Sequence, residues 1–137
     1  MRKWTIIFAV CLTGCTISFA TSEEEVMQPL AAALTKVSNV VEVTLRYEQL
    51  PTDISEQDLL LLATKHDRGL LVPFEKYSLR VSTADKHAVV LVCTKDASRG
   101  LLEDAGCSAA MDRHLWQLQP SNRCQFTLDV KLVCPLQ

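Results

Sequence analysis

Cysteine and histidine are the residue types of this 137-residue chain best suited to redox, metal or acid–base chemistry, and their spacing separates these roles. Four of the six cysteines lie in the second half of the chain, at Cys93, Cys107, Cys124 and Cys134. No two of them form a CxxC pair, so the spacing does not support a thioredoxin-like redox site. An even number of cysteines is instead typical of a disulfide framework when a chain is exported.

Four cysteines allow three pairings, and the last segment of the chain favours one of them. Between Cys124 and Cys134 apolar and polar side chains alternate, which predicts a strand. Such a strand would hold its ends about 33 Å apart at roughly 3.3 Å per residue, whereas a disulfide needs Cα atoms within about 7 Å. We therefore expect these two cysteines to bond to different partners. The expected sheet favours Cys93–Cys134 with Cys107–Cys124, although its first strand would separate Cys93 from Cys134 by about 10 Å.

The histidines and carboxylates form no recognisable catalytic or metal motif. His66, His87 and His114 lie far apart in sequence, and the spacing of Cys107 and His114 is not one used for zinc. The adjacent acids at 103–104 would point in different directions on a helix, as on a solvated face. GxSxG, SxxK, HExxH and glycine-rich phosphate loops are absent from the sequence. The sequence thus predicts no catalytic residue, no metal ligand and no cofactor.

Charge and composition exclude some classes of partner. Arg2 and Lys3 are the only charged residues among the first 20, which leaves 12 basic and 16 acidic residues beyond Ala20. The basic residues are scattered and aromatic residues make up only 6% of the chain, so neither a phosphate-binding surface nor a base-stacking surface is expected. Nucleic acid is therefore not an expected partner.

The first 20 residues have the pattern of an export signal. Arg2 and Lys3 precede an apolar run at 4–12 that is too short to span a membrane. Small residues at Ser18 and Ala20 suit cleavage after residue 20, so residues 1–20 are expected to be a signal peptide. Residues 12–15, LTGC, instead resemble the bacterial lipobox, in which the cysteine becomes the lipidated first residue. Both cleavage sites stay open, and lipidation at Cys15 would anchor the chain to a membrane.

The apolar periodicity of the remaining chain predicts a mixture of helices and strands. Residues 88–93 are its most apolar short run and predict a strand that is buried on both faces. Asp96 is expected to begin a helix that Gly106 ends. The other expected elements are a helix at 30–37, a strand at 41–47, a helix at 55–68, a strand at 77–82, a helical piece at 108–116 and a strand at 124–134.

The order of these elements predicts the fold class. After the N-terminal helix they run strand, helix, strand, strand, helix, strand, which is the split βαβ or ferredoxin-like order, βαββαβ. We expect a single α+β domain at residues 21–137, with an antiparallel sheet and helices on one of its faces.

Export, disulfides and the lack of catalytic motifs favour a small, non-enzymatic protein of the bacterial envelope that binds a protein or a cell-wall component. We expect it in the periplasm or anchored to the outer membrane, with membrane contact only through a lipid on Cys15. One alternative is a secreted or periplasmic inhibitor of a hydrolase, which a protruding loop with one anchoring side chain would favour. Another is an enzyme with a site built from distant residues, which a deep pocket holding a histidine or carboxylate pair would favour.

Overall fold

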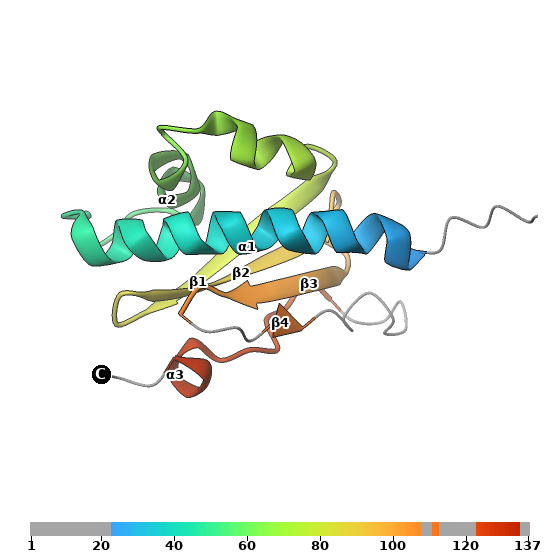
Figure 1. The fold of residues 1–137 in the computed structure, drawn as a ribbon. Helices are drawn as coiled ribbons and strands as arrows, with labels where there is room; N and C mark the ends of the chain where they lie inside the picture. Colours follow the sequence, from blue (N-terminus) through green and yellow to red (C-terminus); the bar gives the residue numbers. More distant parts are fainter. Residues whose placement is uncertain (1–22, 108–110, 113–122, 135–137) are drawn as a thin grey trace, which may run out of the picture.

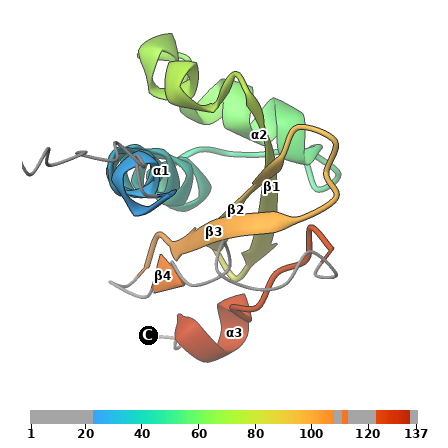
Figure 2. The same cartoon turned by 90° about the vertical axis from the view of Figure 1, so that its right-hand side faces the viewer.

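A computed structural model of the chain describes residues 23–107, 111–112 and 123–134. Within these residues a long helix and a shorter helical layer lie on one face of an antiparallel sheet, and the C-terminal segment lies on the other (Figures 1 and 2). No helix among the described residues is both long and apolar enough to cross a membrane. The elements are α1 (Glu23–Tyr47), α2 (Glu56–Ala63), the 3-10 helix η1 (Arg68–Phe74), β1 (Tyr77–Ala84), β2 (His87–Thr94), β3 (Gly100–Ala105), β4 (Met111–Asp112) and α3 (Val130–Val133).

Helix α1 is longer than the sequence predicts, and the expected strand at 41–47 is wrong. Leu34, Val37 and Val41 are fully buried and recur at the spacing of one helix face, so the apolar stripe continues past Asn39. Val43 and Tyr47, which seemed to extend an alternating strand pattern, are 54% and 81% exposed on the other side of the helix. The alternation of apolar and polar residues at 41–47 therefore does not indicate a strand, since these residues belong to both faces of α1.

Helix α2 begins where the sequence predicts. The side chain of Ser55 accepts a hydrogen bond from the amide of Asp58, which caps the first turn. Leu59 and Leu60 are buried against the core, whereas Leu61 is 41% exposed. The helix ends at Ala63, earlier than expected, and the chain continues into η1.

The sheet is built from consecutive antiparallel strands in the order β1-β2-β3-β4, with β4 only two residues long. The strands predicted at 77–82 and 88–93 are confirmed as β1 and β2, and β2 is buried along its interior. Asp85 and Lys86 join them in a two-residue turn with φ of 49° and 68°, the left-handed values of a type I′ hairpin. The β1–β2 hairpin could thus be predicted from its sequence.

The predicted helix at 96–105 is wrong, because Gly100–Ala105 form β3. All six residues of β3 are buried, and alternate residues face opposite sides of the sheet. Glu103 and Asp104 are therefore not on a solvated helix face: one lies under each layer that covers the sheet. The predicted helical piece at 108–116 lies largely outside the described residues, and in its described part it is wrong, because Met111–Asp112 form β4.

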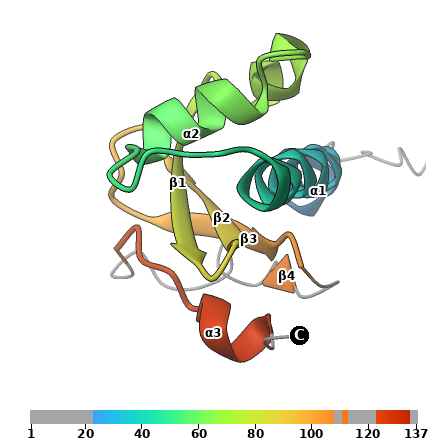
Figure 3. The ribbon, with the colours of Figure 1, turned by 90° about the vertical axis from the view of Figure 1, so that its left-hand side faces the viewer.

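The two faces of the sheet are covered by different parts of the chain. Val81, Val90 and Leu102 pack in one apolar cluster with residues of α1 and α2. On the opposite face, Val89 and Ala105 pack with residues of α3 and the segment before it. The C-terminal segment crosses below the sheet in Figure 3. An α+β class is confirmed, but helices are not confined to one face.

The split βαβ order is not observed among the described residues. It required a strand at 41–47, which is helical, and a strand at 124–134, where the chain instead runs irregularly to Asp129, the N-cap of α3. The alternation of apolar residues at 126–132 arises because Phe126 and Leu128 contact the sheet from an irregular segment and Val130 contacts it from the first turn of α3. Leu132, which the same alternation placed on the buried face, is 81% exposed.

Candidate functional site

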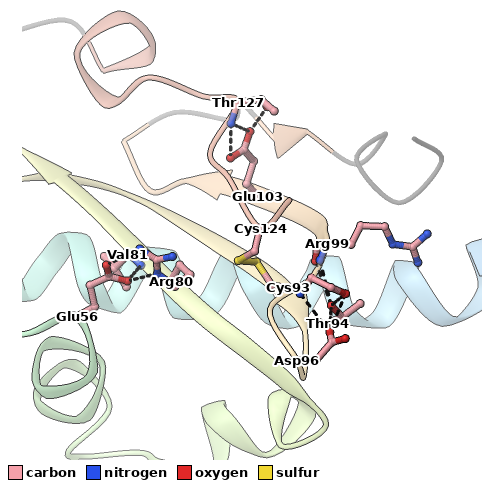
Figure 4. Close-up of a disulfide and its surroundings, with 11 residues drawn as sticks. Glu56, Arg80, Val81, Cys93, Thr94, Asp96, Arg99, Glu103, Cys124 and Thr127 are labelled. Atoms are coloured by element: carbon pink, nitrogen blue, oxygen red, sulfur yellow. Dashed lines mark hydrogen bonds and ion pairs between the residues drawn. A yellow bond between two sulfur atoms is a disulfide. The ribbon is translucent and has the colours of Figure 1, made fainter. Parts of the chain in front are cut away.

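Two disulfides tie the C-terminal segment to the sheet. Cys93 in β2 is bonded to Cys124, with Cα atoms 5.6 Å apart, and Cys107 after β3 is bonded to Cys134, with Cα atoms 5.7 Å apart (Figure 4 shows the first). Cys124 and Cys134 have different partners, as predicted, but the favoured pairing Cys93–Cys134 with Cys107–Cys124 is wrong. It assumed parallel strands that the sheet does not have. Paired disulfides persist in an oxidising, exported environment.

A buried polar cluster lies where α1 crosses the start of β2. Glu42, on the sheet-facing side of α1, contacts Nδ1 of His87 through Oε1 and accepts the amide hydrogen of Ala88 through Oε2 at 2.9 Å. Arg46, one turn later, donates to the same Oε1 from Nη2 at 2.9 Å. The side chains of Glu42 and His87 are only 6% and 14% exposed. These hydrogen bonds offset the free-energy cost of removing the Glu42 carboxylate from water.

A second polar contact lies one turn earlier on α1. Ser38 Oγ contacts Oδ2 of Asp104 and also lies 3.1 Å from the carbonyl oxygen of Thr35. Burial raises the pKa of the Asp104 carboxyl, opposed by the hydrogen bond from Ser38. A hydroxyl has one hydrogen to donate, so Ser38 donates either to the carboxylate of Asp104 or to the carbonyl of Thr35.

The structure brings His87 close to a disulfide, which its sequence position does not reveal. A ring nitrogen of His87 and the Sγ atoms of Cys107 and Cys134 lie within 4.8 Å of one another. His87 begins β2 and Cys107 follows β3, so the antiparallel pairing of these strands places both at one end of the sheet. The spacing of 20 residues between His87 and Cys107 matches no metal-binding motif. Their proximity follows only from the register between β2 and β3.

Among the residues that the structure describes, no strand pairs with the outer edge of β1. The sheet order places it at one end, and its register with β2 pairs Ala84 with His87 across the hairpin. In an antiparallel ladder alternate residues bond to the neighbour, so the backbone groups of Tyr77, Leu79, Val81 and Thr83 point away from β2. Among the described residues, only Val81 of these four has its outward amide engaged, by Oε2 of Glu56 at 2.9 Å.

Glu56 is held at this edge by an ion pair. Its carboxylate accepts two hydrogen bonds from Arg80, at 2.8 and 3.0 Å, beside the bond from the Val81 amide (Figure 4). The hydrogen bonds from Arg80 lower the pKa of Glu56 below its usual value. The carboxylate of Glu56 thus accepts the hydrogen bond from Val81 that a carbonyl group of an added strand would otherwise accept.

Two grooves flank β1, one at each end. The first, about 320 Å³, lies between α2, η1 and the start of β1 and is lined in part by Leu60, Phe74 and Leu79, with Lys95 at its side. The second, about 380 Å³, lies between the end of β1 and the C-terminal segment and includes Thr83 and Lys131 in its lining. The lining of the first groove is mixed, and it is more apolar than that of the second.

Other residues singled out by the sequence lie apart from these features. Neither groove is lined by His87 or Glu42, and His66 is exposed between α2 and η1. Cys15 and His114 lie outside the described residues, as does the whole expected signal at 1–20.

Comparisons with known proteins give no assignment: no protein-family model matches the chain, no curated protein is similar to it in sequence, and no solved structure is similar to it in fold. A proposal for the function therefore rests on the geometry of the described residues.

Proposed function

We propose that the chain is a small, non-enzymatic protein of the bacterial envelope that binds an extended segment of a partner protein along the open edge of β1. The observation that carries this proposal is the row of outward backbone groups on β1 between two grooves. Backbone pairing at an open sheet edge supplies affinity, and pockets for alternate side chains supply selectivity.

The positions of the grooves fit the geometry of a bound strand. Successive side chains of a strand point to opposite faces of a sheet. The first groove contacts residues 77–79 of β1 on the side of α2, and the second contacts residues 82–84 on the side of the C-terminal segment. A strand paired along β1 would place an apolar side chain in the first groove. It would place a side chain of opposite orientation, with polar character, near Asp129 and Lys131 in the second.

Glu56 lowers the affinity of the β1 edge for any added strand. An added strand competes with its carboxylate for the amide of Val81, so only a partner that also fills the grooves gains enough to displace it. The same contact discourages unselective pairing between copies of the chain, since charged side chains at an edge oppose edge-to-edge association.

The arrangement gives less support to the alternative functions. Wall binding on a broad polar sheet face is disfavoured because both faces are covered by other parts of the chain. The Glu42–His87 pair lines neither groove, so neither groove would bring a substrate to a histidine–carboxylate pair. Inhibition of a hydrolase would be one consequence of edge binding if the partner segment came from that enzyme.

The remaining parts of this proposal concern the ends of the chain. An exported, disulfide-bonded domain at residues 21–137 would reach the periplasm after removal of residues 1–20, or stay anchored to the outer membrane through Cys15. Mass analysis of the purified protein tests this, since a start at Cys15 with acyl mass and a start at Thr21 without it are readily distinguished.

Two variants at one edge position test the binding mode. Thr83→Pro removes an outward amide without removing a bond to β2, whereas Thr83→Val keeps that amide. We expect short peptides with alternating apolar residues, screened as an array, to bind the wild type and the valine variant. The proline variant should lose at least tenfold in affinity, as expected when one ladder bond and its neighbours are disturbed.

A third variant tests the role of Glu56. Glu56→Ala should increase the affinity of the same peptides several-fold, because the Val81 amide is then free to pair. Glu48→Ala is the matched control, since Glu48 is also held by a surface ion pair, to Lys65, but is not bonded to the edge of β1. Equal binding by all four variants would show that the edge is not the site.

A further inference from the structure

We propose that reduction of the Cys107–Cys134 disulfide creates a zinc site, with His87 as the third ligand. The two sulfurs and a ring nitrogen of His87 already lie within 4.8 Å of one another. Around a tetrahedral Zn²⁺ with bonds of about 2.0–2.3 Å, ligand atoms are roughly 3.5 Å apart. The three groups therefore need only side-chain rotation to reach this arrangement once the sulfur–sulfur bond is broken.

Glu42 prepares His87 for this role. Its Oε1 contacts Nδ1 of His87, and in the tautomer with the ring hydrogen on Nδ1 this nitrogen donates to the carboxylate. Arg46 Nη2 lies 3.4 Å from Nδ1 but donates over the shorter distance of 2.9 Å to the same Oε1. The lone pair is then on Nε2, for which the described residues offer no hydrogen-bond partner. A histidine that donates through one nitrogen to a carboxylate and binds metal through the other is the usual arrangement at protein zinc sites. Glu42 is thus a positioning residue.

The ligand set matches zinc in chemistry and in charge. Two thiolates and one imidazole are the protein ligands of a three-ligand zinc site, with water in the fourth position. Two thiolates neutralise the divalent ion, so the filled site adds no net charge to a region where Glu42 and Arg46 are already paired. Softer ligands of this type discriminate against Ca²⁺ and Mg²⁺, which prefer oxygen.

The redox step is a thiol–disulfide exchange with a dithiol reductant. Attack by one thiolate of the reductant forms a mixed disulfide and releases one cysteine, and its second thiol then releases the other. The reductant ends as a disulfide, and the chain holds two thiols. Zinc binding displaces the two thiol protons. In the oxidised state the disulfide joins α3 to the end of β3, and in the reduced state the metal would take over that connection.

The second disulfide supplies an internal control. Cys93 and Cys124 have no histidine or carboxylate close enough to complete a group of three metal-ligating atoms among the described residues. Reduction of this pair would give two thiols without a third ligand. Zinc should consequently distinguish the two cysteine pairs in one molecule.

Alkylation of the reduced protein tests the proposal directly. The full chain is reduced with a water-soluble phosphine, which is converted to its oxide with oxygen from water, and alkylated with and without one equivalent of Zn²⁺. We expect zinc to slow the labelling of Cys107 and Cys134 by at least tenfold, measured by peptide mass, and to leave Cys93 and Cys124 unaffected. Labelling of Cys107 and Cys134 at rates independent of zinc would overturn the proposal.

Spectroscopy and two variants separate a built site from metal held by loose thiols. Co²⁺ in place of Zn²⁺ should give the thiolate charge-transfer and tetrahedral bands with reduced protein and no such bands with oxidised protein. His87→Ala should lower the Co²⁺ affinity by at least tenfold, and Glu42→Gln by a smaller factor. Unchanged affinity in His87→Ala overturns the assignment of that ligand. A reduced chain that unfolds, as judged by circular dichroism, and does not refold with zinc overturns the site itself.

Discussion

Glu103 holds the backbone of Thr127 beneath the sheet. Its two carboxylate oxygens lie 3.0 and 3.1 Å from the Thr127 amide nitrogen, and Oε1 also contacts the Thr127 hydroxyl (Figure 4). The amide of Leu128 donates to Oε1 at 2.8 Å. The side chain is fully buried. One carboxylate of β3 therefore supplies the acceptors that the irregular C-terminal segment lacks because it forms no strand.

Glu103→Gln should destabilise the fold. The amide group of glutamine replaces one acceptor oxygen with a donor that faces the Thr127 N–H group, and the bonds to the remaining oxygen lose the charge of the carboxylate. We expect a loss of about 1–3 kcal/mol in the free energy of unfolding, measured by denaturant titration. Glu48→Gln, which changes an exposed ion pair with Lys65, is the control and should cost less than about 1 kcal/mol. Similar values for the two variants would contradict the buried role of Glu103.

Asp104→Asn should stabilise the fold at neutral pH. The pKa of Asp104 is raised in the folded state by burial, so the folded chain binds its proton more tightly than the unfolded chain does. Wild-type stability from this group is thus greatest in acid and falls as pH rises from the ordinary pKa of the carboxyl through its raised value. Asparagine carries no charge at any of these pH values, so the variant does not lose stability in this way, and its side-chain oxygen can still accept from Ser38.

Unfolding curves between pH 3 and 8 check the Asp104 prediction. The variant and the wild type should be closest in stability at the acid end, and the variant should gain relative to the wild type as pH increases. A stability difference that is constant over this range, or that favours the wild type at neutral pH, would contradict it.

Gly106→Ala should be strongly destabilising, because α1 passes too close for a side chain. A Cβ atom at this position would lie 2.6 Å from the carbonyl oxygen of Ser38 and 3.0 Å from Cβ of Glu42. The first of these is helix backbone and can move only with α1. We expect a cost of about 1–3 kcal/mol by thermal or chemical unfolding. Gly69→Ala should cost less, since its nearest atom is the flexible carboxylate of Asp67.

Lys86→Gly should stabilise the β1–β2 hairpin. Lys86 has φ of 68° in the type I′ turn, a conformation in which a Cβ atom is strained and glycine is not. We expect a gain of about 0.5–1 kcal/mol, after allowance for the greater freedom of glycine in the unfolded chain. Lys76→Gly is the matched control: Lys76 is also an exposed turn residue but has no positive φ, so glycine there should give no gain.

Local patterns predicted the parts of the fold in which one signal dominates. The valine-rich run at β2, the alternation and turn of the β1–β2 hairpin, and the capped start of α2 each specify their structure within a few residues. Tertiary contacts decided the rest. Residues 100–105 carry helix-compatible residues but pair with β2, and there Glu103 finds backbone donors that no sequence pattern shows.

The candidate site was harder to predict than the fold. The four cysteines were recognisable as a disulfide set, but their pairing depends on the register between β2 and β3 and on the path of the C-terminal segment. His87 and Glu42 are 45 residues apart, and Glu42 lies in a part of α1 that the sequence predicted to be a strand. The open edge of β1 is a property of strand order, which local periodicity does not contain.

The interleaved order of the two disulfides has a consequence for oxidative folding. Cys93 pairs past Cys107 to reach Cys124, and Cys107 pairs past Cys124 to reach Cys134. When the chain is oxidised progressively from its N-terminal end, the first thiol that Cys93 meets is therefore the wrong one. Maturation of the native protein then depends on reshuffling of that early bond, and its yield should follow the supply of a disulfide isomerase rather than that of an oxidase.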